Sequence, residues 1–289
     1  MNNKESTARL LITCPDRPGI VASVTGFLYN HGANITCLDQ HSSDPEGGTL
    51  FMRIEFQTPH LDLTRGLLSQ TFGETVANKH AMEWKLSFAA DRKKVAILVS
   101  KYDHAMLELL WRATRGELPA DISMVISNHP DLKESVQRFA VPFEIIPVNS
   151  DSKEVAESMI LKKLEQNEID LVVLARYMQI LSPEFVAKYP MKIINIHHSF
   201  LPAFAGGNPY LQAKERGVKV IGATAHFVTA DLDQGPIIEQ DVTRVSHRSS
   251  LDDLKENGAD LERVVLARAV KWYLEDRIII YKNRTIVFN

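Results

Sequence analysis

The sequence predicts an α/β protein divided into two domains. Apolar residues at helical spacing alternate along the chain with short apolar runs typical of strands, and this alternation changes its pattern near residue 90. The length of 289 residues also fits two domains of about 150 residues each. We therefore expect a first domain over residues 1–89, a charged linker over 90–94 and a second domain over 95–289.

The first domain is expected to contain four strands and two helices. The strands are predicted over residues 8–13, 34–40, 49–56 and 82–88, and the helices over 20–30 and 61–72. Turn-forming residues from Asp16 to Gly19 separate the first strand from the first helix, and Gly32 ends that helix. The resulting βαββαβ order is the ferredoxin-like pattern.

The second domain is expected to be Rossmann-like, with a mostly parallel sheet. Strands are predicted over 95–100, 122–127, 143–147 and 171–175, and helices over 104–115, 155–167 and 261–277. Most of these strands are unbroken runs of Val, Ile and Leu, which is typical of parallel strands covered by helices on both faces. A final pair of strands is predicted over 278–288, around Lys282 and Asn283.

Charge and cysteine content exclude several classes of protein. The 33 Lys and Arg residues nearly balance 36 Asp and Glu residues, so the chain has no general attraction for nucleic acid or an anionic membrane. No apolar run approaches the roughly 18 residues of a membrane span. Cys14 and Cys37 are too few for a disulfide framework or a zinc site and are expected to be small buried hydrophobes. We expect a soluble, cytoplasmic protein without a bound metal.

Two polar clusters interrupt the apolar strands of the second domain. Strand alternation puts Asn195, His197 and Ser199 on one face, at the carboxyl end of a strand, where α/β sheets bind ligands. A ligand site and a core histidine with satisfied partners are equally good interpretations of this cluster. Later, a strand runs into an acidic loop containing Asp231 and Asp233, for which a solvated turn is the simpler interpretation from the residues alone.

These pieces occur together and in order, and together they resemble a known family. The segments Asn-Ile-His-His-Ser-Phe-Leu-Pro (195–202) and His-Phe-Val-Thr…Leu-Asp-Gln-Gly-Pro (226–236) resemble the folate-dependent formyltransferases, and Arg-Tyr-Met-Gln-Ile-Leu-Ser-Pro (176–183) is similar to their pterin-holding loop. Asp-Arg-Pro-Gly-Ile (16–20) and Gly-Ala-Asn-Ile (32–35) resemble an ACT regulatory module. An ACT domain followed by a formyltransferase domain is the layout of the formyltetrahydrofolate deformylase family, and the resemblance covers essentially the whole chain.

The resemblance implies hydrolysis of 10-formyltetrahydrofolate to formate and tetrahydrofolate, without a cofactor. It implies that formate is supplied for purine biosynthesis and that the folate pool is kept in balance. By position, Asn195 matches the oxyanion donor, His197 its electrostatic partner, and Asp233 the base and proton carrier. The implied substrate-binding residues are Arg176, Met178, Gln179, Ile180, Leu181, Ser199, His226, Thr229 and Asp231. The family loop after the catalytic strand usually has Ala where this chain has Gly207, which is expected to loosen the loop or weaken its contact with the glutamate tail of folate.

The residues also bear on the acceptor of the formyl group. A phosphate-bearing acceptor would need free backbone N–H groups in a Gly-rich turn, but no Gly occurs between Lys93 and Arg115. Bulky side chains from Lys101 to His104 fill the expected position, which favours water as the acceptor. A formyltransferase acting on an amine, and an ACT-type folate sensor without catalysis, are the alternative interpretations.

The ACT resemblance implies an amino-acid effector at an interface between subunits of a homo-oligomer, a dimer or tetramer. Glycine and methionine are the expected effectors, and the alternative is that this domain only mediates oligomerisation. The implied effector-binding residues are Asp16, Pro18, Gly19, Ile20, Asn34 and Ile35. The two turns that carry these residues are expected to lie near each other.

Overall fold

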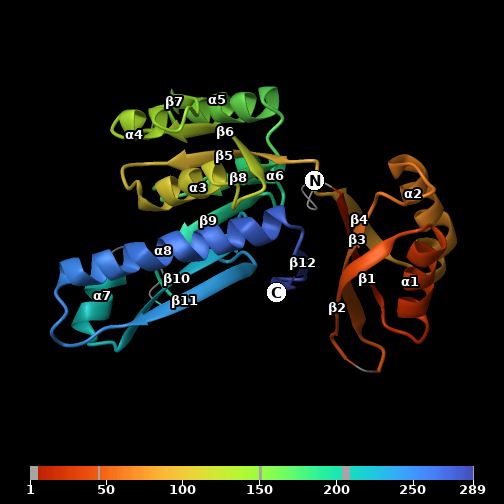
Figure 1. The fold of residues 1–289 in the computed structure, drawn as a ribbon. Helices are drawn as coiled ribbons and strands as arrows, with labels where there is room; N and C mark the ends of the chain where they lie inside the picture. Colours follow the sequence, from red (N-terminus) through yellow and green to blue (C-terminus); the bar gives the residue numbers. More distant parts are fainter. Residues whose placement is uncertain (1–5, 45, 150–151, 204–208, 289) are drawn as a thin grey trace. The chain divides into compact units, whose positions relative to one another are not determined.

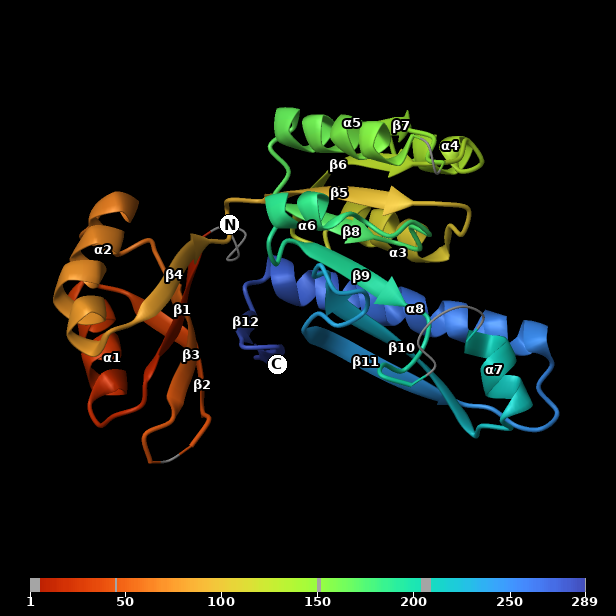
Figure 2. The same cartoon turned by 180° about the vertical axis from the view of Figure 1, so that it is seen from behind.

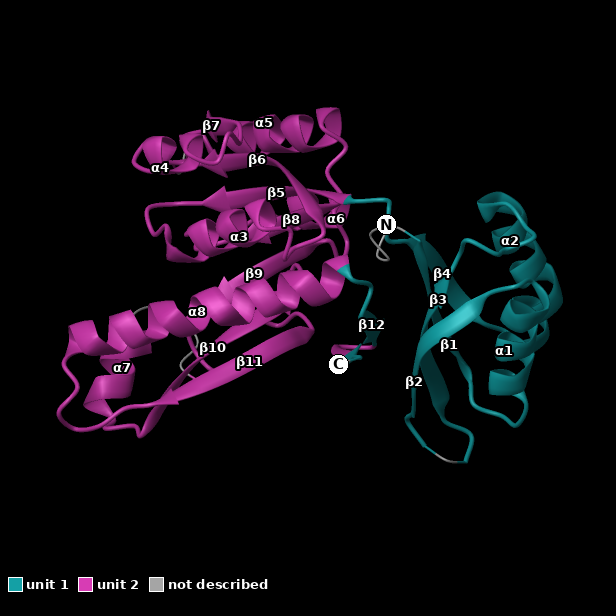
Figure 3. Cartoon of the chain, in the orientation of Figure 1, with its two compact units in different colours: residues 1–92, 275–281, 286–289 teal, residues 93–274, 282–285 magenta. Residues whose placement is uncertain are grey.

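The structure is a computed structural model that describes residues 6–44, 46–149, 152–203 and 209–288 (Figure 1; Figure 2 gives the reverse view). Internal contacts divide the chain into two units (Figure 3). Residues 1–92, 275–281 and 286–289 form the first unit, and residues 93–274 and 282–285 form the second. None of the helices in the described segments combines the length and the apolar character needed to cross a bilayer.

The first unit has the predicted ferredoxin-like order. Its four strands form an antiparallel sheet in the order β2-β3-β1-β4, and the two helices cover one face of the sheet (Figures 1 and 2). The elements are β1 (Thr7–Pro15), α1 (Ile20–Asn30), β2 (Asn34–Ser42), β3 (Thr49–Gln57), α2 (Arg65–Phe72) and β4 (Glu83–Phe88). A π-helical turn, Gly73–Ala77, and a 3₁₀ turn, Asn78–His80, continue α2.

Two local features differ from the sequence prediction. α2 begins four residues later than predicted, because the Thr64 hydroxyl caps the helix by accepting a hydrogen bond from the Leu67 backbone N–H at 3.4 Å. Cys14 is buried as expected, but the expectation for Cys37 is wrong, since Cys37 is exposed. Cys37 lies on the edge strand β2, directly after a register shift that breaks the in–out alternation of that strand.

The first sheet buries apolar side chains on both faces. Leu10 and Ile12 of β1 belong to the core under α1 and α2. Leu11 points to the opposite face, where it and Phe51 of β3 pack against the C-terminal residues Ile279 and Phe288. The C-terminal residues therefore group with the first unit, which differs from the expected division of the chain at this end.

Arg53 secures this face of the first unit. Its side chain is 2% exposed, and Nε donates to the Asp276 carbonyl oxygen at 2.8 Å while Nη2 donates to the Glu275 carbonyl oxygen at 3.0 Å. Nη2 also donates to the Glu55 carboxylate. A planar guanidinium can serve three acceptors at once, so this one side chain ties the C-terminal segment to β3.

Replacing Arg53 with Met is expected to lower the free energy of unfolding by about 2–4 kcal/mol, since two backbone carbonyls and Glu55 lose their donor. Urea unfolding measures the loss. Arg65→Met is the matched control, because Arg65 forms an exposed ion pair with Asp91 and should cost no more than about 1 kcal/mol. Equal losses in the two variants would contradict this role for Arg53.

The second unit contains a seven-stranded sheet in the order β11-β10-β9-β8-β5-β6-β7. The pairs among β5 to β9 are parallel, and β9-β10 and β10-β11 are antiparallel, so the sheet is mostly parallel as predicted. The elements are β5 (Lys93–Val99), α3 (His104–Thr114), β6 (Ala120–Ser127), α4 (Lys133–Gln137), β7 (Phe143–Ile145), α5 (Lys153–Gln166), β8 (Leu171–Leu174), α6 (Pro183–Lys188), β9 (Ile193–His197), α7 (Pro209–Glu215), β10 (Val220–Phe227), β11 (Ile237–Arg244) and α8 (Leu251–Leu274). The predicted final strand pair is the hairpin of β12 (Ile278–Tyr281) and β13 (Arg284–Val287).

The order of the strands defines where this sheet should bind a ligand. From β5 the chain adds β6 and β7 on one side, and then returns to add β8 and β9 on the other. The topological switch point therefore lies between β5 and β8. In open α/β sheets, ligands bind in the crevice outside the carboxyl ends of the strands at this point.

α8 begins ten residues earlier than predicted. The mostly polar segment 251–260 obscures the apolar period. Ser250 and Asp253 nevertheless form a capping box, in which the Ser250 N–H donates to the Asp253 carboxylate at 2.7 Å and the Asp253 N–H donates to the Ser250 hydroxyl at 3.1 Å. Gly258 inside the helix allows close approach of Tyr210, since a Cβ at this position would lie 1.9 Å from the Tyr210 hydroxyl. This helix packs along β9, β10 and β11 and against α3.

Candidate active site

The register between β9 and β10 brings together two of the predicted site residues. His226 lies directly opposite Asn195, and Thr224 lies opposite His197. The Asn195 Nδ2 atom is 3.2 Å from the His226 Nε2 atom. Asn195 and His197 share a face of β9, and Asn195 is partly buried while His197 is 6% exposed.

Asp233 reaches this pair from the loop between β10 and β11. One Asp233 carboxylate oxygen is 3.4 Å from His197 Nδ1, and the other is 3.6 Å from His226 Nε2. The four side chains thus form a continuous series, Asn195–His226–Asp233–His197. The structure brings together Asn195, His197 and Asp233, and it puts His226 at the centre of them.

The loop that carries Asp233 has an unusual backbone. Asp233 has a φ of +56°, in the left-handed region that costs a non-glycine residue free energy. Two residues later, a Cβ at Gly235 would lie 1.8 Å from the Phe227 carbonyl oxygen. The Phe227 N–H donates to the Pro236 carbonyl oxygen at 2.9 Å, so the loop closes tightly onto the end of β10.

Hydrogen bonds assign the protons of the two imidazoles. The His226 Nδ1 atom is 2.9 Å from the Phe227 carbonyl oxygen, which can only accept, so Nδ1 carries a proton. In the neutral ring, Nε2 then accepts from Asn195. His197 donates from Nδ1 towards Asp233, and its buried Nε2 has no hydrogen-bond partner among the described residues.

His197 sets the charge of Asp233. The hydrogen bond from His197 holds the pKa of the Asp233 carboxyl well below its usual range, although partial burial opposes this. Asp233 is therefore ionised at neutral pH. A carboxylate, an amide and two imidazoles whose neighbours along the series lie 3.2 to 3.6 Å apart can polarise a carbonyl group and orient a water molecule.

The lowered pKa predicts a pH-dependent contribution of Asp233 to stability. In the unfolded chain this carboxyl has a pKa of about 3.9. The stability that ionised Asp233 contributes is therefore complete above that pH, and it is lost as the pH falls towards the lower pKa of the folded state. The difference in unfolding free energy between the protein and its Asp233→Asn variant should shrink from about pH 6 to about pH 3. Urea unfolding across this range measures it, and a constant difference would contradict the prediction.

A second set of hydrogen bonds fixes the turn that follows His197. The buried Thr224 hydroxyl donates to the Ser199 carbonyl oxygen at 2.9 Å and accepts from the Leu201 N–H at 3.1 Å. Gln240 of β11 donates to the Leu201 carbonyl oxygen at 3.0 Å. The Ser199 hydroxyl donates to the Ala203 carbonyl oxygen at 2.9 Å, so it supports the turn. The loop containing Gly207 lies outside the described residues.

The predicted pterin-holding loop leads from β8 to α6. The Met178 N–H donates to the Ser100 hydroxyl at 3.0 Å, whereas no hydrogen bond within the described part of the chain uses the backbone of residues 179–181. Met178 and Ile180 are 52% and 60% exposed, and Leu181 is buried. Thr229 and Asp231 lie in the Asp233 loop, where the Thr229 hydroxyl donates to the Asp231 carbonyl oxygen and Asp231 is exposed.

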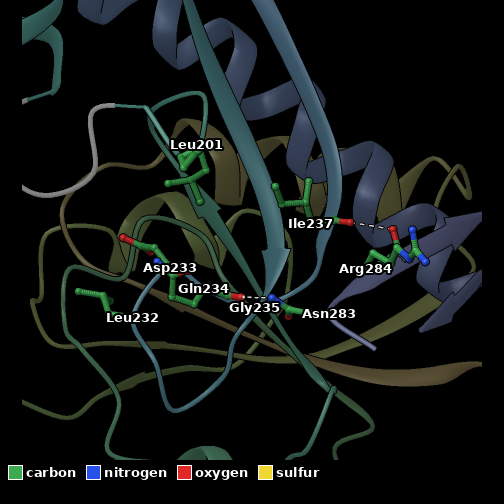
Figure 4. Close-up of a pocket in the computed structure, with 10 residues that line it drawn as sticks. Leu201, Leu232, Asp233, Gln234, Gly235, Ile237, Asn283 and Arg284 are labelled. Atoms are coloured by element: carbon green, nitrogen blue, oxygen red, sulfur yellow. Dashed lines mark hydrogen bonds between the residues drawn. The ribbon is translucent and has the colours of Figure 1, made fainter. Parts of the chain in front are cut away.

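A cavity of about 400 Å³ borders the Asp233 loop (Figure 4). Its lining residues are Leu201, Pro202, Leu232, Asp233, Gln234, Gly235, Ile237, Asn283, Arg284 and Thr285. The Asn283 side chain donates to the Gln234 carbonyl oxygen at 3.1 Å, and the Thr285 hydroxyl donates to the Ile237 carbonyl oxygen at 2.7 Å. Residues 282–285 of the second unit are thereby hydrogen-bonded to both ends of the segment 234–237, which follows Asp233.

The sequence analysis missed a buried polar cluster centred on Glu262 of α8, which is 2% exposed. The His104 Nε2 atom is 2.7 Å from one Glu262 carboxylate oxygen, and the Tyr210 hydroxyl donates to the other at 2.8 Å. Burial acts to raise the pKa of Glu262, but the His104 hydrogen bond and the Arg176 charge outweigh it, so the pKa is lowered. Glu262 follows Leu254 and Gly258 at four-residue spacing on the buried stripe of α8, and this is the signal that could have found it.

The predicted effector residues lie at opposite ends of the first sheet. β1 and β2 both pair antiparallel with β3, so they run parallel to each other, and α1 carries the chain back between them. Asp16 and Gly19 follow the carboxyl end of β1, where Asp16 accepts a hydrogen bond from Ser42 at 2.5 Å. Asn34 begins β2 at the other end, opposite Gln57. The expectation that the two turns lie near each other is therefore wrong within one copy of the chain.

The remaining effector candidates include both exposed and buried residues. Pro18 is exposed, Ile20 is buried in the core under α1, and Ile35 packs partly against that core. In the described segments, no group of three or more His, Cys, Asp or Glu side chains is arranged to hold a metal ion.

Comparisons with known proteins agree with the order of the two domains. Residues 93–270 match the Formyl transferase family, and residues 8–73 match the ACT domain. The chain is also similar to the formyltetrahydrofolate deformylase of Bacillus subtilis (strain 168). The two are 53% identical over 288 residues, which cover 100% of this chain and 96% of that protein.

Solved structures give the same result. A formyltetrahydrofolate deformylase from Pseudomonas syringae pv. tomato str. DC3000 is similar with a TM-score of 0.94 and 45% identity, covering 98% of this chain and 94% of that one. Glycinamide ribonucleotide transformylase 1 from Symbiobacterium toebii is similar with a TM-score of 0.67 and 30% identity, covering 71% of this chain and 98% of that one. The resemblance found in the sequence motifs is confirmed, and the chain belongs to the formyltetrahydrofolate deformylase family.

Proposed function

We propose that this protein hydrolyses 10-formyltetrahydrofolate to formate and tetrahydrofolate. The likeness to proteins named formyltetrahydrofolate deformylase extends over the full chain. The observation that carries the proposal is the series Asn195–His226–Asp233–His197, in which neighbouring side chains approach within 3.2 to 3.6 Å. This set contains a donor for an oxyanion and a carboxylate for water, which are the two groups that the reaction needs.

In this proposal Asn195 and His197 stabilise the tetrahedral intermediate. Attack of water on the formyl carbon places negative charge on the formyl oxygen. One Asn195 N–H donates to His226, which leaves its second N–H for this oxygen. His197 Nε2 has no partner among the residues that the structure describes and, when protonated, supplies a second donor, while Asp233 stabilises the charged imidazole through Nδ1.

Asp233 has the role of orienting the water and moving its proton. The low pKa of the Asp233 carboxyl makes it a weak base in the free protein. Bound folate would exclude water from the carboxylate, and such desolvation raises a carboxyl pKa. We infer that this change activates Asp233 to take a proton from water and deliver it to the folate nitrogen as the C–N bond breaks.

Folate binding is assigned to the loop from Met178 to Leu181 and to the loop around Asp233. The unused backbone groups of residues 179–181 suit the hydrogen-bonding edge of a pterin, and exposed apolar side chains of Met178 and Ile180 suit its ring and the adjoining benzoyl group. Thr229 and Asp231 are the further polar candidates. Ser199 and His226 support the site through the contacts described above.

A formate-release assay on the purified protein tests the proposal. With 10-formyltetrahydrofolate as the only organic substrate, formate should form catalytically and tetrahydrofolate should accumulate in equal amount. Formate that appears only after an amine is added would identify an amine formyltransferase instead. Folate binding without any turnover would identify a sensor.

The ACT domain is proposed to bind glycine or methionine between two copies of the chain. The turn at Asp16 to Gly19 and the start of β2 at Asn34 lie at opposite ends of one sheet, so a site that uses both needs a second copy. We expect a homodimer or tetramer whose rate or melting temperature changes when one of these amino acids is added. Thermal unfolding with each amino acid, and light scattering, measure these effects. Oligomerisation without an amino-acid effect would leave the domain an assembly role only.

We further propose that the protein works in the cytoplasm and that the released formate supplies purine biosynthesis. Both cysteines, Cys14 and Cys37, are free thiols, which fits a reducing compartment. Purine auxotrophy of a deletion strain, relieved by added formate, is the result expected from this supply role.

A further inference from the structure

Arg176 has a backbone conformation that its side chain does not favour. It follows β8 with a φ of +64°, in the left-handed region where glycine is the usual residue. Its side chain is only 9% exposed, so a large cation is buried at a backbone conformation that side chains rarely adopt. Backbone strain of this kind persists only where the surrounding structure holds it in place, and such positions concentrate at functional sites.

The side chain is held away from solvent by two groups. The Arg176 Nε atom is 3.5 Å from a Glu262 carboxylate oxygen, and the guanidinium carbon lies 5.0 Å from the centre of the Tyr102 ring. Glu262 is fixed in turn by His104 and Tyr210. The chain therefore contributes residues from three separate segments, 102–104, 210 and 262, to keep one arginine in place.

Ordinary fold stabilisation does not account for this arrangement. Nη1 of Arg176 is buried without a hydrogen-bond partner in the described part of the chain, and Nε approaches Glu262 only at the longer ion-pair distance given above. Glu262 would still have His104 and Tyr210 as partners if the arginine were absent. A buried donor without an acceptor costs free energy, so the guanidinium is placed here at the expense of stability.

Arg176 lies beside both the topological switch point of the sheet and the proposed catalytic groups. It lies at the carboxyl end of β8, and Tyr102 follows β5, so the two side chains flank the switch point where an α/β sheet normally opens a ligand crevice. The cluster also adjoins the proposed catalytic groups. The His198 ring lies 5.2 Å from the His197 ring on one side and 5.9 Å from the Tyr210 ring on the other.

We propose that Arg176, held by Glu262 and Tyr102, fills the space in which an amine acceptor would approach the formyl group, and thereby restricts the acceptor to water. Arg176 is in this sense a specificity-determining residue rather than a folate ligand. The inference rests on the proposed hydrolase function.

The test measures how the formyl group is divided between water and an amine. The protein and its Arg176→Gly variant are each incubated with 10-formyltetrahydrofolate and either glycinamide or glycinamide ribonucleotide. Formate and the N-formylated amine are quantified by mass spectrometry. The ratio of formylated amine to formate should rise about tenfold or more in Arg176→Gly, since a steric block in a specificity pocket has an effect of this order.

Glu168→Gly is the matched control. Glu168 also has a left-handed backbone, with a φ of +53°, and lies on the surface in an exposed ion pair with Lys94. This variant relieves the same kind of backbone strain and should leave the product ratio unchanged. An unchanged ratio in a folded Arg176→Gly variant would overturn the inference.

Tyr102→Ala keeps the inference testable if Arg176→Gly does not fold. Tyr102 is 55% exposed, so its loss removes the ring beside the guanidinium without opening the core. The ratio should rise in the same direction by a smaller factor, and no rise would again overturn the inference. Failure of the proposed function gives a different result, because the unaltered protein would then release no formate from 10-formyltetrahydrofolate in the absence of an amine.

Discussion

Replacing Asp233 with Asn is expected to lower the turnover of 10-formyltetrahydrofolate by about 10²–10⁴, because the amide can neither accept a proton from water nor stabilise a charged His197. Folate binding should persist, since the amide keeps the size of the carboxyl group. Steady-state formate release gives the rate, and quenching of protein fluorescence by a non-hydrolysable folate gives the affinity.

Asp241→Asn is the control for this experiment. Asp241 lies on β11, where it is partly exposed and pairs with Arg268, and that pairing likewise lowers the pKa of its carboxyl. Its loss removes a paired carboxylate from the same unit without touching Asn195, His226 or His197. Near-normal turnover in Asp233→Asn, or an equal loss in both variants, would refute the proton-carrying role.

Replacing Gly235 with Ala is expected to displace the Asp233 loop. The new Cβ would lie 1.8 Å from the Phe227 carbonyl oxygen, which is backbone and cannot turn aside as a flexible side chain can. We expect a loss of about 2–4 kcal/mol in the free energy of unfolding. Displacement of a catalytic group by about 1 Å also lowers turnover by about 10². Thermal unfolding and formate release measure the two effects.

Gly66→Ala separates this steric effect from a general effect of the substitution. Gly66 lies in α2, and a Cβ there meets no atom within 4 Å. Ala is favoured over Gly inside a helix by about 1 kcal/mol, so this variant should be as stable as the protein or slightly more stable. Equal stability of Gly235→Ala and Gly66→Ala would show that the loop has room to adapt.

The local pattern of the sequence was enough to predict most of the scaffold. The ferredoxin-like order of the first unit and the parallel strands β5, β6 and β8 follow from apolar period and turn residues. Asn195 and His197 share a face because side chains alternate along any strand. The capping box of Ser250 and Asp253 is a further local signal, and it marks the start of α8.

Features that depend on which strands pair could not be predicted from local sequence patterns. The antiparallel pairing of β9 with β10 puts His226 opposite Asn195, and no local pattern encodes which strands become neighbours. The direction of the Arg176 side chain is a similar case. Sequence groups it with the residues of the pterin-holding loop, but the left-handed backbone turns it towards Glu262, a residue 86 positions later in the sequence.

The C-terminal residues have a consequence for how the protein is made. Ile279 and Phe288 cover Leu11 and Phe51, yet they are synthesised long after the strands that carry Leu11 and Phe51. Until then, one apolar face of the N-terminal sheet stays open to water and to other nascent chains. A chain truncated before β12 should therefore aggregate through the exposed face of its first unit, far in sequence from the truncation.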